Sequence, residues 1–179
     1  ILIMYFQQFP KILYGFDKQD FKPVTDLMIR VKVRDKVLNE ISLYNTYDVK
    51  NAETPENIAF KHFGDPALHW VILLTNNITD RYYDWPLSEQ AFEDYVKDKY
   101  SNPDGIHHYE ITQSSGKTKG DGPSDYTHKV EVNSTTSGAT SVSNRQYEQR
   151  EQDKKRQIKL LNRKHLTSFL EEFNKLVRD

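Results

Sequence analysis

The chain has 179 residues, with 25 basic and 26 acidic side chains and a net charge of −1 at pH 7. This near balance argues against bulk attraction to nucleic acid or to an anionic membrane, and the lack of cysteine excludes disulfides and thiol chemistry. Aromatic residues make up 12% of the chain, a content that favours burial against partner proteins.

The first segment, residues 4–21, is aromatic and irregular, without the period of a helix or a strand. Residues 1–10 lack the basic region and cleavage site of a signal peptide, and Met4 is a candidate natural start. Exposed aromatic residues would form an apolar patch, so we expect this arm either to pack across the core or to dock on a neighbouring subunit. Its aromatic residues are Tyr5, Phe6, Phe9, Tyr14, Phe16 and Phe21.

The next predicted elements are a turn or helix cap at residues 23–26 and a strand at residues 29–33. Ile29, Val31 and Val33 alternate with basic residues, which favours a strand. Apolar residues four apart in the same stretch also fit a helix, and we expect a helical turn near Val37.

Residues 44–77 are predicted to form a strand, a helix, a tight turn and a second helix. Thr54-Pro55 is a strong helix start, because the hydroxyl caps the first turn and the fixed φ of proline suits it. Gly64 ends this helix, and Asp65-Pro66 starts the second, which closes at Asn76. We expect Trp70 to be buried in the core.

The loop that follows contains Tyr82, Tyr83 and Trp85. These rings could form a glycan-stacking platform or a protein hot spot. The alternative interpretation, which we favour, is that Trp85 covers the core of the helical hairpin.

Residues 87–153 are predicted to contain one helix, one β-hairpin and mobile loops. Ser88 caps the helix, and residues 107–112 and 128–133 alternate in the manner of paired strands. The Gly/Ser/Thr-rich stretches at 113–126 and 134–144 are expected to be mobile surface loops. Gly116-Lys117-Thr118 lacks the earlier glycine of a phosphate-binding loop, so that function is rejected.

The tail is predicted to contain a strand at residues 156–161 and an amphipathic helix that Asn162 caps. The apolar face of the helix contains Leu166, Phe169, Leu170, Phe173, Leu176 and Val177.

No set of residues indicates catalysis or a metal site. His107 and His108 are adjacent, so in a strand their side chains would face opposite sides and make a poor metal pair. His62 and His69 lack a carboxylate at ligand spacing, and structural roles are expected for both. We therefore predict that the chain is not an enzyme and needs no cofactor.

The stretch at 44–76 resembles a LysM-like module. The matching residues are Tyr47-Asp48-Val49, Glu53-Thr54-Pro55, Ile58-Ala59, Phe63-Gly64-Asp65-Pro66, Trp70-Val71-Ile72 and Asn76. The resemblance implies an α+β fold with a LysM-like strand–helix–helix–strand core. Such a core needs a second strand beside the one around Tyr47, and residues 156–161 are the candidate. The divisions that follow are an arm and first strand or helix at 1–43, a core with the tail helix at 44–86 plus 154–179, and an insertion at 87–153. Around this core we expect the N-terminal aromatic arm, the inserted helix plus β-hairpin and the C-terminal amphipathic helix.

Most of the chain also resembles the baseplate wedge protein 53 family of T-even-like contractile-tailed bacteriophages. Six parts of the sequence carry this resemblance. They are the arm at 5–12, the segment 54–59, the turn at 64–66, the helix at 69–77, the residues Tyr83 and Trp85-Pro86, and the tail at 154–161. Family members often have proline at the position of Arg81, a departure that affects only that loop. The match is weakest over residues 113–145.

This resemblance implies a structural subunit of the virion tail baseplate that assembles in the host cytoplasm. It would clamp neighbouring wedges around the hub by contacts with other wedge subunits, without nucleic acid, membrane or small-molecule substrate. The candidate partner-contact residues are Tyr5, Phe6, Phe9, Tyr14, Phe16, Tyr82, Tyr83, Trp85, Phe169 and Phe173. The alternative is a LysM-type module that binds peptidoglycan.

Overall fold

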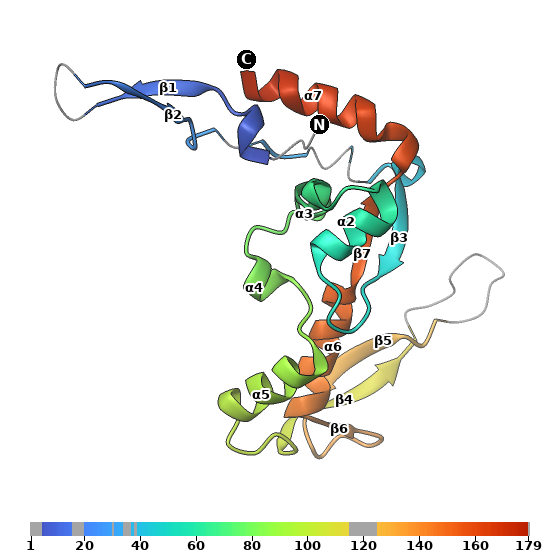
Figure 1. Cartoon of the computed structure of the whole chain (residues 1–179). Helices are drawn as coiled ribbons and strands as arrows, with labels where there is room; N and C mark the ends of the chain where they lie inside the picture. Colours follow the sequence, from blue (N-terminus) through green and yellow to red (C-terminus); the bar gives the residue numbers. More distant parts are fainter. Residues whose placement is uncertain are drawn as a thin grey trace. The chain divides into compact units, whose positions relative to one another are not determined.

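The computed structural model describes residues 5–15, 20–29, 31–33, 37, 39–114 and 125–178. Within these ranges the fold is α+β, with six α-helices and three small antiparallel sheets. The chain divides into two compact units (Figure 1): unit 1 contains Ile1–Pro86 and Lys155–Asp179, and unit 2 contains Leu87–Lys154. In the described part, no helix has both the length and the apolar character needed to cross a bilayer.

An antiparallel pair of strands from distant parts of the chain closes the core of unit 1. Strand β3 (Tyr44–Asp48) pairs with β7 (Gln157–Leu161), and Tyr47 lies opposite Ile158. This confirms the predicted partner of the Tyr47 strand. The side chain of Asn76 also binds β7, because its carboxamide accepts from the N–H of Lys159 and donates to the C=O of Lys159, both at 2.8 Å.

The two helices between these strands begin and end where the sequence predicts. Helix α2 (Pro55–Phe63) starts at Thr54, whose Oγ1 accepts from the N–H of Asn57, and ends at Gly64, which has a φ of 86°. Asp65 caps the 3-10 turn η3 (Pro66–Leu68), and α3 (His69–Thr75) continues from it. An N-cap of this kind contributes about 1 kcal/mol. Local chemistry therefore decides where the helical segments of this hairpin begin and end.

The C-terminal helix completes the core of unit 1. After the 3-10 turn η4 (Arg163–His165), α7 (Leu166–Arg178) lies over α3 (Figure 1) and buries Phe173 and Val177. Trp70 on α3 is buried beneath it, as predicted. Short elements η2 (Ile41–Leu43) and α4 (Arg81–Asp84) flank the central stretch.

A buried carboxylate, that of Glu53, links β3 to α2. It accepts hydrogen bonds from Tyr47 Oη at 2.9 and 3.0 Å and from the N–H of Lys50, and it pairs with Lys61 Nζ. Burial and the hydrogen bond from its hydroxyl to Glu53 raise the pKa of Tyr47 to about 12. Trp85 is buried and its Nε1 donates to the carbonyl oxygen of Glu53 at 2.9 Å. This confirms that Trp85 covers the core of the helical hairpin.

The N-terminal region differs from the prediction in the position of its strands. Strands β1 (Lys11–Tyr14) and β2 (Lys22–Thr25) form a hairpin in a segment predicted to be irregular and then a turn or helix cap. Residues 29 and 31–33, predicted as a strand, belong to no strand or helix. The strands form where β1 and β2 can pair with each other. Ile29 and Val31 do not join a sheet, and they pack against the core. Most of the helical turn predicted near Val37 lies outside the described residues.

Unit 2 is built on a three-stranded sheet with the order β5-β4-β6. Strand β4 (Ile106–Gln113) pairs with β5 (His128–Val132), which confirms the predicted hairpin. Helix α5 (Glu89–Lys99) begins after Ser88, as predicted, with Ser88 Oγ accepting from the N–H of Ala91. Much of the first predicted loop, residues 115–124, lies outside the described part.

Two elements of unit 2 occupy sequence that was predicted as a mobile loop or left without an element. Strand β6 (Thr140–Ser143) pairs with β4, so the prediction of a mobile loop at 134–144 is wrong there. Val142 is buried, and Thr140 Oγ1 donates to the carbonyl oxygen of Glu110. Helix α6 (Asn144–Arg156) follows directly.

The prediction that His107 and His108 face opposite sides is also wrong. An irregularity in the β4–β6 pairing between Ile106 and His108 interrupts the alternation of the strand. The two Nδ1 atoms lie 2.8 Å apart, and the ring of His107 stacks on Tyr147 at 4.0 Å.

The buried carboxylate of Glu110 holds the sheet of unit 2 against α6. Arg150 donates to both of its oxygens at 2.7 and 2.9 Å, and Lys129 Nζ lies 2.7 Å from Oε1. The hydrogen bonds from Arg150 and Lys129 outweigh the effect of burial and lower the pKa of Glu110 from 4.5 to about 2. Ionised Glu110 therefore stabilises the folded state at pH values above 4.5, its ordinary pKa. This stabilisation is lost as the pH falls towards 2, the pKa of Glu110 in the folded state.

We expect the Glu110→Gln variant to show a weaker dependence of stability on pH than the wild-type chain. Between pH 4.5 and 2, the wild type should lose about 2 kcal/mol of unfolding free energy relative to the variant. Urea unfolding across this range measures the difference. Glu131→Gln, a change at the exposed residue opposite Glu110 in β5, is the control. Equal slopes for wild type and Glu110→Gln would contradict the assignment.

Candidate assembly surface on the N-terminal arm

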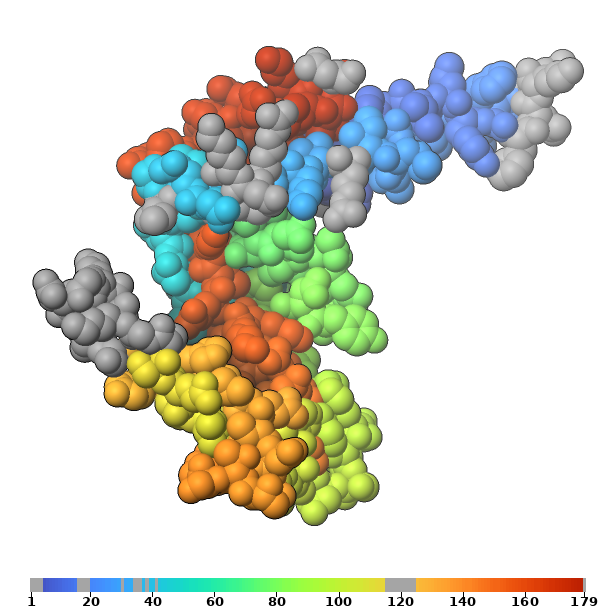
Figure 2. Space-filling view, turned by 180° about the vertical axis from the view of Figure 1, so that it is seen from behind, coloured from blue at the N-terminus to red at the C-terminus, as the bar shows by residue number. Residues whose placement is uncertain are grey.

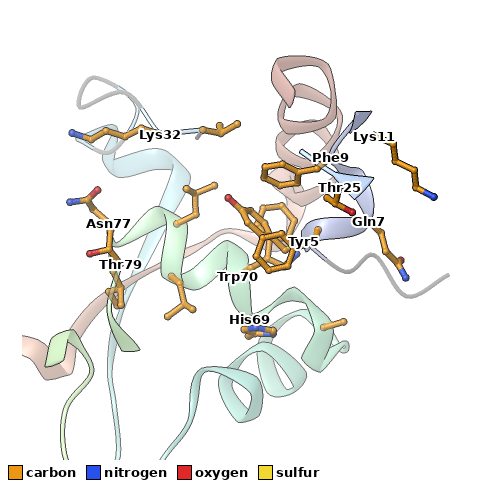
Figure 3. Close-up of a pocket in the computed structure, with 16 residues that line it drawn as sticks. Tyr5, Gln7, Phe9, Lys11, Thr25, Lys32, His69, Trp70, Asn77 and Thr79 are labelled. Atoms are coloured by element: carbon orange, nitrogen blue, oxygen red, sulfur yellow. The ribbon is translucent and has the colours of Figure 1, made fainter. Parts of the chain in front are cut away.

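Four aromatic side chains fasten the start of the N-terminal arm to the core; we call them the aromatic root. They are Tyr5 and Phe9, at and just after the 3-10 turn η1 (Tyr5–Gln8), with Trp70 on α3 and Phe173 on α7. The ring of Tyr5 lies 5.3 Å from Trp70 and 5.5 Å from Phe173, and Trp70 and Phe173 are 4.6 Å apart. Figure 3 shows Tyr5 and Phe9 beside Trp70.

The aromatic root joins three segments that are far apart in the sequence. Phe9, Trp70 and Phe173 are buried, and Tyr5 is partly buried against them. Aromatic pairs at these separations contribute about 0.5–1.5 kcal/mol each beyond the area they bury. Of the two outcomes that the sequence left open, the start of the arm therefore follows the first and packs back on the core.

A cavity of about 1150 Å³ lies beside the aromatic root. Its walls come from η1, from the base of the β1–β2 hairpin and from α3. The lining is largely apolar, but it includes Lys11, Lys32 and His69 and, among its described residues, no carboxylate. Figure 3 shows the two lysines on opposite sides of the aromatic root. The cavity suits an apolar group that has acidic neighbours.

The rest of the arm is an exposed apolar hairpin. In the register of β1 and β2, Ile12 lies opposite Val24 and Leu13 opposite Pro23. Because alternate residues of a strand face opposite sides, the two pairs leave apolar side chains on both faces. Leu13 is 72% exposed, and Figure 2 shows both strands, in blue, standing out from the rest of unit 1. The other exposed apolar residues of this region are Phe6, Tyr14, Phe21, Leu27 and Met28.

Apart from the hairpin, two exposed aromatic side chains lie on α4. Tyr82 is 85% exposed and Tyr83 76% exposed. Asp80 caps the helix by accepting from the N–H of Tyr82, and Arg81 donates to both oxygens of Glu56 on α2 at 2.7 and 3.0 Å. These contacts fix the backbone of α4 while leaving both rings at the surface.

The candidate partner-contact residues divide into three groups. Phe9, Trp85 and Phe173 are buried inside unit 1, and Tyr5 and Phe169 pack against its core. Phe16 lies outside the described residues. The candidates with large exposed surfaces are Phe6, Tyr14, Tyr82 and Tyr83.

Sequence reasoning missed the aliphatic part of the exposed surface. Ile12, Leu13 and Val24 were not candidates, although they lie in the hairpin. The available signal was the run Ile12-Leu13-Tyr14 directly before Gly15, because a short apolar and aromatic run bounded by a turn residue is typical of a strand.

The described histidines and carboxylates form no cluster that could hold a metal ion. Two histidines of unit 1 have structural roles, as predicted. His62 Nε2 donates to the carbonyl oxygen of Leu161 at 2.8 Å, which ties α2 to β7. His69 Nδ1 donates to the carbonyl oxygen of Pro66 at 3.0 Å.

Comparison with known proteins decides the family. The family model described as "Base plate wedge protein 53" matches residues 4–176, which is almost the whole chain. The chain belongs to the baseplate wedge protein 53 family. Members are structural proteins of the virion tail baseplate and not enzymes.

A related protein is baseplate wedge protein gp53 of Enterobacteria phage T4. The chain is 34% identical to it over 85 residues, which are 46% of this chain and 42% of the T4 protein. The matched part therefore spans less than half the length of that relative.

The Gly15→Ala substitution is expected to open the hairpin while leaving the core intact. A Cβ at this position would lie 2.7 Å from the carbonyl oxygen of Asp20, so the backbone would have to move. We expect cleavage by a protease within residues 11–25 to accelerate at least about fivefold, with the thermal midpoint of unit 1 unchanged. Lys11→Ala, at an exposed position of β1, is the control. Unchanged cleavage would show that Gly15 is dispensable for the hairpin.

Proposed function

We propose that the chain clamps adjacent wedges of the baseplate together around the hub, and that the arm makes the contacts. The observation that carries this proposal is the exposed apolar hairpin, fastened at one end by the aromatic root. The partners we propose are other baseplate wedge subunits, assembled in the host cytoplasm. Nucleic acid, membranes and small molecules are not proposed as ligands.

The energetics of the hairpin support a role in assembly. An isolated two-stranded hairpin is at best marginally stable in water, and this one leaves Leu13 and Phe21 largely exposed. Burying apolar surface contributes roughly 25 cal/mol per Å², so contact with a partner would stabilise both the interface and the hairpin. Because the aromatic root already orders the start of the arm within the chain, binding a partner loses less conformational entropy there.

The remaining parts have distinct roles in this proposal. Residues 44–86 with 154–179 form a LysM-like scaffold, residues 1–43 are the N-terminal arm with the element that follows it, and residues 87–153 are an insertion. The order β3, α2, α3, β7 supports the LysM-like interpretation, as do the caps at Thr54 and Asp65. Tyr82 and Tyr83 are proposed as a second contact.

The alternative function is binding of peptidoglycan by the LysM-like core. The exposed rings of Tyr82 and Tyr83 favour it, because flat aromatic faces also stack on sugars. A pull-down on purified peptidoglycan, with Tyr82→Ser/Tyr83→Ser as the matched variant, separates the two functions. Saturable binding that the variant loses would support the alternative and contradict assembly as the role of this module.

We expect the double variant Leu13→Ser/Phe21→Ser to fold normally and to lose assembly. Co-purification with co-expressed wedge proteins of the same phage should fall at least about tenfold, because removing two apolar contacts costs more than about 1.4 kcal/mol. Phe60→Ser is the control, since Phe60 on α2 is 61% exposed but lies outside the arm. Normal assembly of the double variant, or equal loss with Phe60→Ser, would contradict the proposal.

A further inference from the structure

The two edges of the β1–β2 hairpin differ in their capacity to form further backbone hydrogen bonds. The N–H of Asp26 donates to the carbonyl oxygen of Pro10 at 2.8 Å, and these residues continue the register that pairs Ile12 with Val24. In an antiparallel pair, positions alternate between hydrogen-bonded and non-hydrogen-bonded. The backbone groups of Ile12 and Val24 therefore point inward.

The intervening positions point their backbone groups outward. These are Lys11 and Leu13 on β1, and Pro23 and Thr25 on β2. Proline has no N–H, so Pro23 weakens the outer edge of β2 as a site for another strand. The outer edge of β1 keeps both N–H and C=O groups at Lys11 and Leu13, and in the described part of the chain the sheet has no third strand.

We propose that the outer edge of β1 binds an extended segment of a different baseplate protein as a third, antiparallel strand. This inference rests on the proposed function, and it names the kind of partner that the arm receives. Strand addition of this kind draws affinity from main-chain hydrogen bonds and specificity from alternate side chains. Each outward residue of β1 offers one donor and one acceptor, so Lys11 and Leu13 together supply four hydrogen bonds.

The charges on β1 and in the cavity beside it favour an added strand that carries acidic residues. Lys11 and Lys22 are exposed, and β1 and β2 contain no acidic residue, while Asp20 and Asp26 lie just before and just after β2. The nearby cavity has Lys11 and Lys32 in its lining and no carboxylate among the described residues there. An added strand with apolar and acidic residues would place its apolar groups against Leu13 and its acids near the lysines. The β1 strand of a second copy has no acidic residue to pair with Lys11, so we infer a different protein.

The Leu13→Pro variant tests the backbone part of this proposal. It removes an outward N–H of β1 while sparing the inward ladder, and it should reduce co-purification with co-expressed wedge proteins at least tenfold. Leu13→Ala keeps the N–H and should bind better than Leu13→Pro. Thr25→Pro removes the corresponding N–H from β2 and should bind like the wild type.

Each other outcome overturns a defined part of the account. Equal loss with Leu13→Ala and Leu13→Pro would show docking through side chains alone, which ends strand addition but leaves the clamp. Equal loss with Thr25→Pro would contradict the choice of edge. If neither these variants nor Leu13→Ser/Phe21→Ser changes binding, the proposed function itself fails.

Amide hydrogen exchange of the wild-type chain provides a test that does not depend on the folding of a variant. On binding the wedge proteins, the amides of Lys11 and Leu13 should exchange at least tenfold more slowly, while that of Thr25 should not change. Slowing at Thr25 alone would overturn the proposal. A synthetic peptide of alternating Glu and Val should protect the same amides more strongly than one of alternating Lys and Val. The reverse preference, or a dimer of the chain formed through this edge, would overturn the chemistry of the partner.

Discussion

The packing of Tyr5 and Phe9 against Trp70 and Phe173 is the contact on which the arrangement of unit 1 depends. It is the point at which the first residues of the chain, the second helix of the hairpin and the last helix meet. Without it, the segment that contains β1 and β2 would keep its core contacts at Ile29 and Val31 but lose those at its start. With it, the hairpin begins at a fixed place, and less conformational entropy is lost when a partner binds.

The core that holds the aromatic root is closed by contacts between distant segments. Strand β7 reaches β3 only after the whole of unit 2, and Asn76 and His62 fasten α3 and α2 to its backbone. This construction lets residues 87–154 form a separate compact unit without breaking the core. For a proposed clamp, it provides a rigid base and leaves an exposed arm for contact with partners.

The elements that could be predicted are those that local chemistry specifies. Thr54, Asp65 and Ser88 each combine a capping side chain with a favourable following residue, and all three start helical segments. The pairing of β3 with β7 was predictable because the LysM-like resemblance requires a second strand beside β3, and Ile158 and Leu160 alternate with polar residues in the tail. The family resemblance supplied the function, which no arrangement of catalytic or metal-binding residues could have indicated.

The missed elements depend on information that apolar periodicity does not contain. Helix α6 buries Glu148 and Gln152 and has almost no apolar stripe, so its stability comes from polar contacts such as Lys99 with Glu148. Strand β6 exists because β4 has a second edge to pair with, and β1 and β2 exist because they pair with each other. Among the candidate contacts, Phe9 and Phe173 could not be separated from Phe6 and Tyr14, because residue type alone does not reveal which rings meet inside the chain.

A double-mutant cycle between Phe9 and Phe173 tests most directly whether the aromatic root fastens the arm. Their rings lie 6.3 Å apart in an edge-to-face arrangement, on residues 164 positions apart in the sequence. Unfolding free energies of the wild type, Phe9→Ala, Phe173→Ala and the double variant would be measured in urea. We expect a coupling energy of about 1 kcal/mol. A coupling energy near zero, with the two single losses simply adding, would show that these rings do not fasten the arm.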